Sequence, residues 1–148
     1  MTTLVWDGTT LAADKQANVA GMRRQVTKIH KFDNNLVGFS GDYDFAMDML
    51  EWMKSGGDPK TFPETQKKED TYVNTLWIPS PDKIFVFERS PYPIDFSENM
   101  FICMGSGRDF AYGAMDMGAD AIRAVEIANK YDTGSGLGVD FLRFGDEK

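Results

Sequence analysis

The stretch that decides how this chain folds is Met1-Thr-Thr-Leu-Val-Trp-Asp-Gly-Thr-Thr-Leu-Ala-Ala-Asp14. Two short runs of β-forming residues flank Asp7-Gly8, a dipeptide that tolerates the positive φ angles of a tight turn. The stretch therefore predicts a β-hairpin at the start of the chain. It has neither the basic segment nor the apolar segment of a secretory signal, so we expect no targeting function.

Thr2 gives the same stretch a second, chemical interpretation. Met1 is commonly removed when the second residue is small, and the chain then begins at Thr2. A first-residue threonine carries a hydroxyl and a free α-amine with a pKa of roughly 7.7–8.0, which makes a nucleophile with its own base. The simpler interpretation is an ordinary start followed by an edge strand, and the stretch alone does not choose between them.

Composition limits the class of protein and its partners. The 148 residues are 42% apolar and 26% charged, which predicts one globular domain over residues 1–148. The net charge of −7 argues against nucleic acid, because phosphate contacts need clustered Lys and Arg. No apolar run approaches the ~20 residues of a membrane span, so we expect no membrane partner. Cys103 cannot form an internal disulfide and is expected in a buried strand, which fits a cytoplasmic location.

The single histidine, His30, limits the chemistry that the chain can use. A Ser-His-Asp triad or a His-rich metal site would have to rest on this residue, which we expect only to fill a strand position. No CxxC, HExxH or EF-hand spacing occurs in the sequence. We therefore expect no metal and no other cofactor, and a base other than histidine in any hydrolytic mechanism.

The rest of the chain predicts groups of strands and helices in an α+β order. Periodicity and turn residues predict strands over 26–32, 36–40, 72–78, 84–88, 101–104 and 139–144. Helices are expected over 42–54, 105–118 and 120–131. Segments 15–25 and 89–99 are predicted to be a polar connector and a loop, and 55–70 holds at most a short helical turn. This order favours antiparallel hairpins with helices packed on sheet faces.

Six short motifs, taken in order, resemble one known family. They are Thr2-Thr-Leu-Val5, Ala13-Asp-Lys-Gln-Ala17, Thr27-Lys-Ile29, Gly38-Phe-Ser-Gly41, Gly105-Ser-Gly107 and Asp132-Thr-Gly-Ser-Gly136. Together they resemble proteasome β-subunits and HslV peptidases, which are N-terminal-nucleophile (Ntn) hydrolases. None of the motifs is specific alone, but the six in this order are. The resemblance implies a four-layer αββα sandwich.

The resemblance implies a role for the residues at the start of the chain. Thr2 would be the nucleophile, and its α-amine would take the hydroxyl proton through a water. Lys28 would lie beside the Thr2 hydroxyl and stabilise developing negative charge. Asp14 would pair with Lys28, because a buried lysine without a partner is costly.

Further roles fall on later motifs. Ser106, Asp132 and Ser135 would complete the network around the amine, and the Gly41 amide would donate to the oxyanion. The pocket for the side chain before the cut bond would be lined by Val26, Phe39 and Met47, which suits an apolar residue. Simpler interpretations exist: Ser106-Gly-Arg-Asp109 is a capping box, and Asp132 and Ser135 are typical of a helix-to-strand turn.

The chain departs from the family over 55–70, which is too polar and proline-marked for the family's second long helix. We expect that helix to be shortened or missing, with a loop or a neighbouring subunit covering the sheet. The resemblance implies a threonine-type endopeptidase that acts on polypeptides through an acyl-enzyme. It also implies a self-compartmentalising homo-oligomer of one ring or stacked rings, with an AAA+ unfoldase as a candidate partner. Two alternatives stay open: a catalytically silent proteasome-like assembly subunit that retains Met1, and an Ntn amidohydrolase of a small amide.

Overall fold

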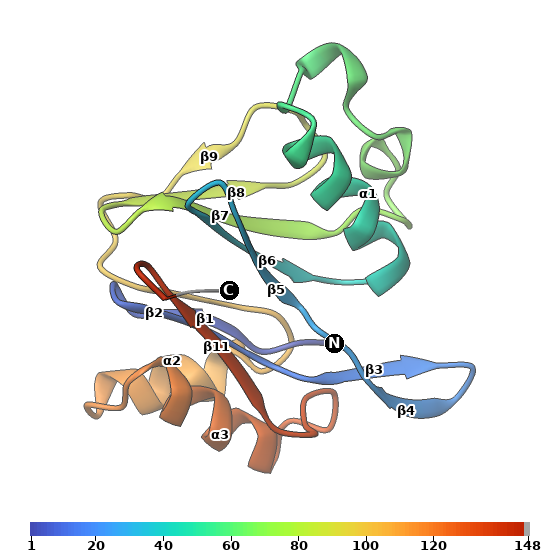
Figure 1. Ribbon diagram of the computed structural model, residues 1–148. Coiled ribbons are helices and arrows are strands. Elements are labelled where there is room, and N and C mark those ends of the chain that lie inside the picture. Colours follow the sequence, from blue (N-terminus) through green and yellow to red (C-terminus); the bar gives the residue numbers. More distant parts are fainter. Residues whose placement is uncertain (147–148) are drawn as a thin grey trace.

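The computed structural model describes residues 1–146 and arranges them in four layers (Figure 1). Helices α2 (Arg108–Asp116) and α3 (Ala121–Tyr131) form one outer layer, and helix α1 (Tyr43–Lys54) lies on the opposite side. Two antiparallel sheets lie between them. This is the αββα arrangement that the sequence resemblance implies. No helix in residues 1–146 is both long and apolar enough to cross a bilayer.

The four-stranded sheet is built around the first hairpin. Its strand order is β10 (Ile102–Met104), β1 (Leu4–Trp6), β2 (Thr10–Asp14) and β11 (Val139–Arg143). The predicted turn at Asp7-Gly8 is confirmed, since Gly8 has a φ of 96° in the left-handed region that glycine favours. The Asp7 carboxylate closes the turn by accepting hydrogen bonds from the N–H groups of Thr9 and Thr10.

The five-stranded sheet follows chain order. Its strands are β5 (Ile29–Phe32), β6 (Asn35–Ser40), β7 (Asn74–Ser80), β8 (Lys83–Phe87) and β9 (Ile94–Asp95). The predicted strands are present with shifted ends, and Lys28 lies just before β5 rather than inside it. The expectation of a plain loop over 89–99 is wrong at β9, which pairs through Ile94 with Val86 of β8.

Segment 15–25 is a β-hairpin, so the predicted polar connector is wrong. Strand β3 (Gln16–Val19) pairs with β4 (Met22–Gln25), and the two turn residues, Ala20 and Gly21, have φ angles of 52° and 75°. Two positive φ angles in a two-residue loop are the signature of a type I′ turn. The hairpin projects beyond the sandwich, and every residue of β4 is exposed. Because no face of β4 is buried, its sequence shows no alternation of apolar and polar residues.

The core lies between the two sheets, and each sheet also buries its outer face. Leu4 and Trp6 of β1 point inward and pack with Leu36 and Leu76 from the opposite sheet. Val5, between them, points outward and packs against α3. Alternation along a strand covered on both faces explains why β1 is wholly apolar.

The segment between α1 and β7 holds no long helix, as the sequence predicts from its departure from the family that it resembles. It holds two short 3₁₀ helices, Pro59–Thr61 and Glu64–Lys67, where we expected at most one short turn. Phe62 is nevertheless buried and packs edge-on against Trp52, with ring centres 5.0 Å apart. Buried Gln66 donates to the Phe45 carbonyl and accepts from the Val73 N–H. The segment itself therefore covers part of the sheet face that a helix would cover.

Candidate active site

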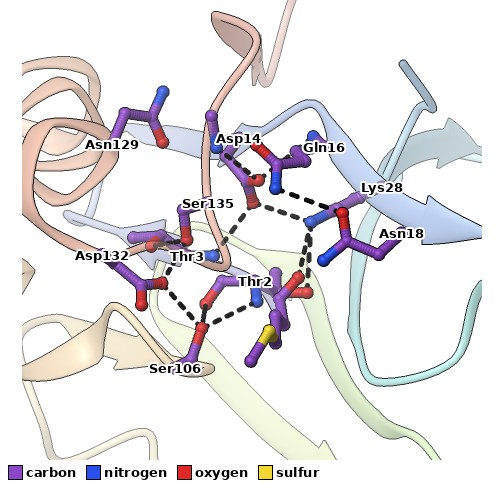
Figure 2. Close-up of polar contacts among 12 residues, drawn as sticks. Thr2, Thr3, Asp14, Gln16, Asn18, Lys28, Ser106, Asn129, Asp132 and Ser135 are labelled. Atoms are coloured by element: carbon purple, nitrogen blue, oxygen red, sulfur yellow. Dashed lines mark hydrogen bonds and ion pairs between the residues drawn. The ribbon is translucent and has the colours of Figure 1, made fainter. Parts of the chain in front are cut away.

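The Lys28 ammonium lies at the centre of a buried polar cluster near the N-terminus (Figure 2). Lys28 Nζ donates to Asp14 Oδ1 at 2.8 Å and to Thr2 Oγ1 at 3.2 Å. It also donates to the Met1 carbonyl oxygen at 3.0 Å. Asp14 is the last residue of β2, and Lys28 lies in the segment that leads into β5 of the other sheet. The structure thus brings together Thr2, Asp14 and Lys28.

Asp14 is fully buried, and both of its carboxylate oxygens are occupied. Besides Lys28, it accepts hydrogen bonds from the backbone N–H groups of Thr3, Gln16 and Gly136 at 3.0–3.1 Å. A buried ion pair is tolerated when its remaining hydrogen-bonding capacity is satisfied, as it is here. Asp14 therefore ties the N-terminal segment, the start of β3 and the loop after α3 to one point.

The surroundings of Lys28 shift its protonation equilibrium. Burial lowers the pKa of the Lys28 ammonium, and the ion pair with Asp14 opposes that shift. The ammonium lies within hydrogen-bond distance of the Thr2 hydroxyl. A cation in that position stabilises negative charge that develops on the oxygen during nucleophilic attack.

A chain of hydroxyl groups reaches Thr2 from the other side. The Thr2 N–H donates to Ser106 Oγ at 3.2 Å, and Ser106 donates to Asp132 Oδ2 at 2.7 Å. Ser135 donates to the same carboxylate oxygen at 2.6 Å. Burial alone would raise the pKa of Asp132, but the hydrogen bonds from Ser135 and Ser106 outweigh it and lower the pKa. The ionised carboxylate orients both hydroxyls, one of them toward the Thr2 nitrogen.

The capping-box interpretation of Ser106-Gly-Arg-Asp109 is wrong. The N-cap residue of α2 is Gly107, and no side chain caps this helix. The loop instead closes on the N-terminal segment, since the Gly107 N–H donates to the Thr2 carbonyl at 3.1 Å. A side chain at Gly105 would clash with the Thr2 carbonyl oxygen, and one at Gly107 would clash with Thr3 Oγ1. The Gly-Ser-Gly motif therefore permits close approach to Thr2.

Two residues of this network were not predicted from the sequence. Thr3 Oγ1 and Ser135 Oγ share a hydrogen bond of 2.7 Å, so Thr3 joins the hydroxyl chain. The Thr2-Thr3 pair could have indicated this, because adjacent residues leading into a strand point to opposite sides and can reach different partners. Gln16 Nε2 donates to the Thr133 carbonyl at 3.4 Å and connects β3 to the loop after α3. Nothing in the sequence distinguishes Gln16 from an ordinary polar strand residue.

A cavity of about 550 Å³ opens beside Lys28. The three residues predicted to line a substrate pocket, Val26, Phe39 and Met47, all line it, and so does Gly41. Gly41 has a φ of 133° and directly precedes Asp42, the N-cap residue of α1. The first N–H groups of a helix lack intrahelical partners, so this edge of the cavity suits a developing oxyanion.

Other reactive side chains lie outside the cluster. Within residues 1–146, no group of three or more His, Cys, Asp or Glu side chains is placed to hold a metal ion. Cys103 is buried in β10 as predicted, and burial raises the pKa of its thiol to about 12. A thiol with that pKa stays protonated near neutral pH and is a poor nucleophile.

Solved structures share this fold over nearly the whole chain. Eukaryotic HslV from Trypanosoma brucei superposes with a TM-score of 0.70 at 19% identity, covering 95% of this chain and 97% of that chain. BPH from Thiobacillus denitrificans, in complex with epoxomicin, gives 0.68 at 20% identity, covering 98% and 99%. A further structure of the same BPH gives 0.66 at 19% identity, covering 99% of each chain. No family model matches the sequence, and a search of curated proteins finds no match. The chain therefore has the HslV-like, proteasome-type fold over nearly all of its length.

Proposed function

We propose that this chain is a threonine-type endopeptidase whose nucleophile is Thr2, exposed as the first residue by removal of Met1. The observation that carries the proposal is the position of Lys28 Nζ, which donates to both Thr2 Oγ1 and Asp14 Oδ1. A buried ammonium fixed on a threonine hydroxyl has little structural purpose, because desolvating a charge costs free energy. Stabilising an alkoxide during attack is a purpose that justifies that cost.

The reaction proceeds in two stages. The free α-amine of Thr2 takes the hydroxyl proton through a water, and Oγ1 attacks the carbonyl carbon of a substrate peptide bond. Lys28 and the Gly41 amide stabilise the negative charge on the attacking and carbonyl oxygens. The C–N bond then breaks, the leaving amine takes a proton, and an ester remains on Thr2. Water hydrolyses this ester and regenerates the hydroxyl.

The hydroxyl chain sets the state of the amine. Ser106 Oγ accepts from the Thr2 nitrogen and donates to Asp132, which also accepts from Ser135. A Thr2 amine held by Ser106 keeps its lone pair aimed at the reacting water, and ionised Asp132 favours proton uptake by the amine. These three residues are positioning residues in the proposed mechanism.

The small size of the chain and its fold support a proposal of assembly. A chain of 148 residues cannot by itself exclude folded proteins from a catalytic site. We propose a cytoplasmic homo-oligomer, one ring or stacked rings, that confines the sites and degrades polypeptides, with an AAA+ unfoldase as its partner. Size measurement in solution tests the assembly, and a stable monomer contradicts it.

Substitution of Thr2 tests the nucleophile. Thr2→Ala is expected to reduce peptide cleavage by at least about 10³-fold, whereas Thr2→Ser keeps a hydroxyl and measurable activity. Thr9→Ala, which changes an exposed threonine in the first turn, is the matched control and should cleave like the unsubstituted protein. Epoxomicin, present in the BPH structure of similar fold, is expected to inhibit this chain too. Cleavage that survives in Thr2→Ala contradicts the proposal.

A second candidate function keeps the fold without the chemistry. With Met1 in place, Lys28 Nζ donates to the Met1 carbonyl, and the Thr2 nitrogen is an amide rather than an amine. The polar cluster is then fully hydrogen-bonded without any substrate. A chain that retained Met1 in the cell would be a silent assembly subunit. The intact mass of the native protein shows whether Met1 is retained.

A further inference from the structure

We propose that the cavity beside Lys28, whose ammonium contacts the Thr2 hydroxyl, accepts a lysine or arginine side chain, so that the peptidase cuts after basic residues. This inference rests on the proposed function and names its substrate class. The sequence alone favoured an apolar residue at this position. The charges at the cavity rim lead to a different conclusion.

The inner part of the cavity is apolar. Phe39 and Ala46 are 4% and 3% exposed, and Val26 and Met47 are partly buried beside them. These side chains offer contacts to carbon atoms and no hydrogen-bonding groups. The methylene stem of lysine or arginine packs on such a surface while the charged end stays near water.

The outer part of the cavity is acidic. Asp42 and Asp44, at the start of α1, both line the cavity and are exposed. Neither side chain forms an ion pair or a hydrogen bond with any residue in the part of the chain that the structure describes. Asp42 occupies the N-cap position, where an aspartate usually accepts an N–H bond from its helix, yet it makes no such bond. Both carboxylates are therefore available to a ligand.

The side chain of Lys28, which also lines the cavity, does not neutralise this rim. Among residues 1–146 no other lysine or arginine lines the cavity, and the Lys28 ammonium is paired with Asp14 at 2.8 Å. The Lys28–Asp14 pair has no net charge, so the rim carboxylates leave the cavity negative. The net charge of −7 over the chain adds to the attraction of cationic peptides.

The three kinds of substrate side chain differ in what they leave unpaired. An apolar side chain fills the inner cavity but leaves Asp42 and Asp44 partly desolvated without a partner, which weakens binding. An acidic side chain is repelled by the same carboxylates. A lysine or arginine satisfies both parts, because charge-assisted hydrogen bonds to carboxylates are stronger than neutral ones.

A matched set of peptides tests the charge directly. The probes are fluorogenic peptides that differ only in the residue before the cut bond, namely arginine, lysine, citrulline, leucine or glutamate. Citrulline has the shape of arginine without its charge. For protein that begins at Thr2, kcat/KM is expected to be about three- to tenfold higher for arginine than for citrulline, as for a partly exposed ion pair. Leucine and glutamate peptides should be cut more slowly still, and added salt should reduce the arginine preference.

Variants of Asp42 and Asp44 test whether these two carboxylates cause the preference for arginine over citrulline. Asp42→Asn combined with Asp44→Asn should bring the ratio of arginine to citrulline close to one. Glu51→Gln removes one charge from the exposed side of the same helix, away from the cavity, and should leave the ratio unchanged. Circular dichroism checks that α1 is retained in each variant. A leucine or glutamate peptide cut best, or a ratio that persists in the double variant, overturns the inference and leaves the peptidase in place. Absence of Thr2-dependent cleavage for every peptide overturns the proposed function and the inference with it.

Discussion

At the scale of single residues, Asp14 holds the site together more than Lys28 does. Asp14 accepts from Lys28 and from three backbone N–H groups. Lys28 makes its hydrogen bonds to Asp14, Thr2 and Met1, and only Asp14 carries a compensating charge. Loss of Lys28 therefore leaves Asp14 with its three N–H donors, whereas loss of Asp14 leaves the buried Lys28 ammonium without a counter-charge.

Asp14→Asn is expected to lower the free energy of unfolding by about 3–5 kcal/mol, because Lys28 stays buried without its counter-charge. Lys28→Met should cost less, since the Asp14 carboxylate keeps its three N–H donors. Both variants should lose peptide cleavage. Urea unfolding of the two variants measures the difference, and an equal or reversed order contradicts this account of the pair.

Asp132 gives the site an acid-sensitive component. The lowered pKa of Asp132 means that its ionised form favours the folded state. That contribution is present above the ordinary carboxyl pKa of about 4 and is lost as the pH falls through the folded-state pKa. Asp132→Asn should therefore lower the free energy of unfolding by about 1–2 kcal/mol at neutral pH, and by less near pH 3.

Urea unfolding at both pH values measures this dependence on Asp132. Glu51→Gln, which removes an exposed carboxylate from α1, is the control and should change stability little at either pH. If the loss of unfolding free energy in Asp132→Asn became larger as the pH fell, the result would contradict this interpretation of Asp132.

The residue types and motif order predicted more of the candidate site than local patterns did. Thr2, Asp14, Lys28, Ser106, Asp132 and Ser135 lie in one hydrogen-bonded cluster, as the resemblance implied. The capping-box pattern at Ser106 was misleading, because a serine before a helix serves equally well as a partner for a distant carboxylate. Thr3 and Gln16 were missed because their partners depend on how the loop after α3 meets the hairpin.

At the scale of elements, the loop before α2 is shaped to receive the N-terminal segment. Gly105 has a φ of 94°, and a Cβ there would strike the Thr2 carbonyl oxygen. The atom that such a Cβ would strike belongs to the backbone. Rotation of a side chain therefore cannot relieve the clash. The site depends on this loop as much as on its polar side chains.

Two substitutions, one before α2 and one inside it, distinguish the need for close contact with Thr2 from the general effect of replacing a glycine by alanine. Gly105→Ala is expected to destabilise by more than about 2 kcal/mol and to reduce cleavage, because positive φ and a backbone clash coincide. Gly113→Ala, inside α2 with open space around it, should stabilise by about 0.5–1 kcal/mol and leave cleavage intact. Thermal unfolding and a peptide assay measure both, and a tolerated Gly105→Ala contradicts the proposed packing.

Elements with a buried face were predictable, and exposed elements were not. The strands β1, β6 and β7 and the helices α1 and α3 carry apolar residues that mark a buried face. The β3–β4 hairpin has no such face, and its turn is formed by Ala20-Gly21 rather than by Asn-Gly or Asp-Gly. The two-residue strand β9 is too short to leave a pattern.

At the scale of the whole molecule, the three hydrophobic clusters share the two sheets. Strand β1 contributes Leu4 and Trp6 to the core between the sheets and Val5 to the cluster against α3. Strand β6 contributes Leu36 to that core and Val37 to the cluster against α1. Loss of either sheet would therefore disrupt two clusters at once, which supports one cooperative domain over the chain.

Denaturant unfolding is expected to show a single transition. Trp6 reports on the core between the sheets and Trp52 on the cluster against α1. Tryptophan fluorescence and far-ultraviolet circular dichroism should give the same midpoint in urea. Trp52→Phe leaves two probes, the fully buried Trp6 and the partly buried Trp77, and should keep the two signals coincident. Separate midpoints would show that the α1 side unfolds independently.

The central claim is that this fold carries a peptidase whose nucleophile is a free N-terminal Thr2. The most direct measurement compares intact mass with peptide cleavage across preparations that differ in the fraction of chains lacking Met1. Co-expression with or without a methionine aminopeptidase provides such preparations. We predict that the cleavage rate rises in proportion to the fraction of chains that begin at Thr2 and extrapolates to zero when Met1 is fully retained. Equal cleavage by chains that keep Met1 would contradict it.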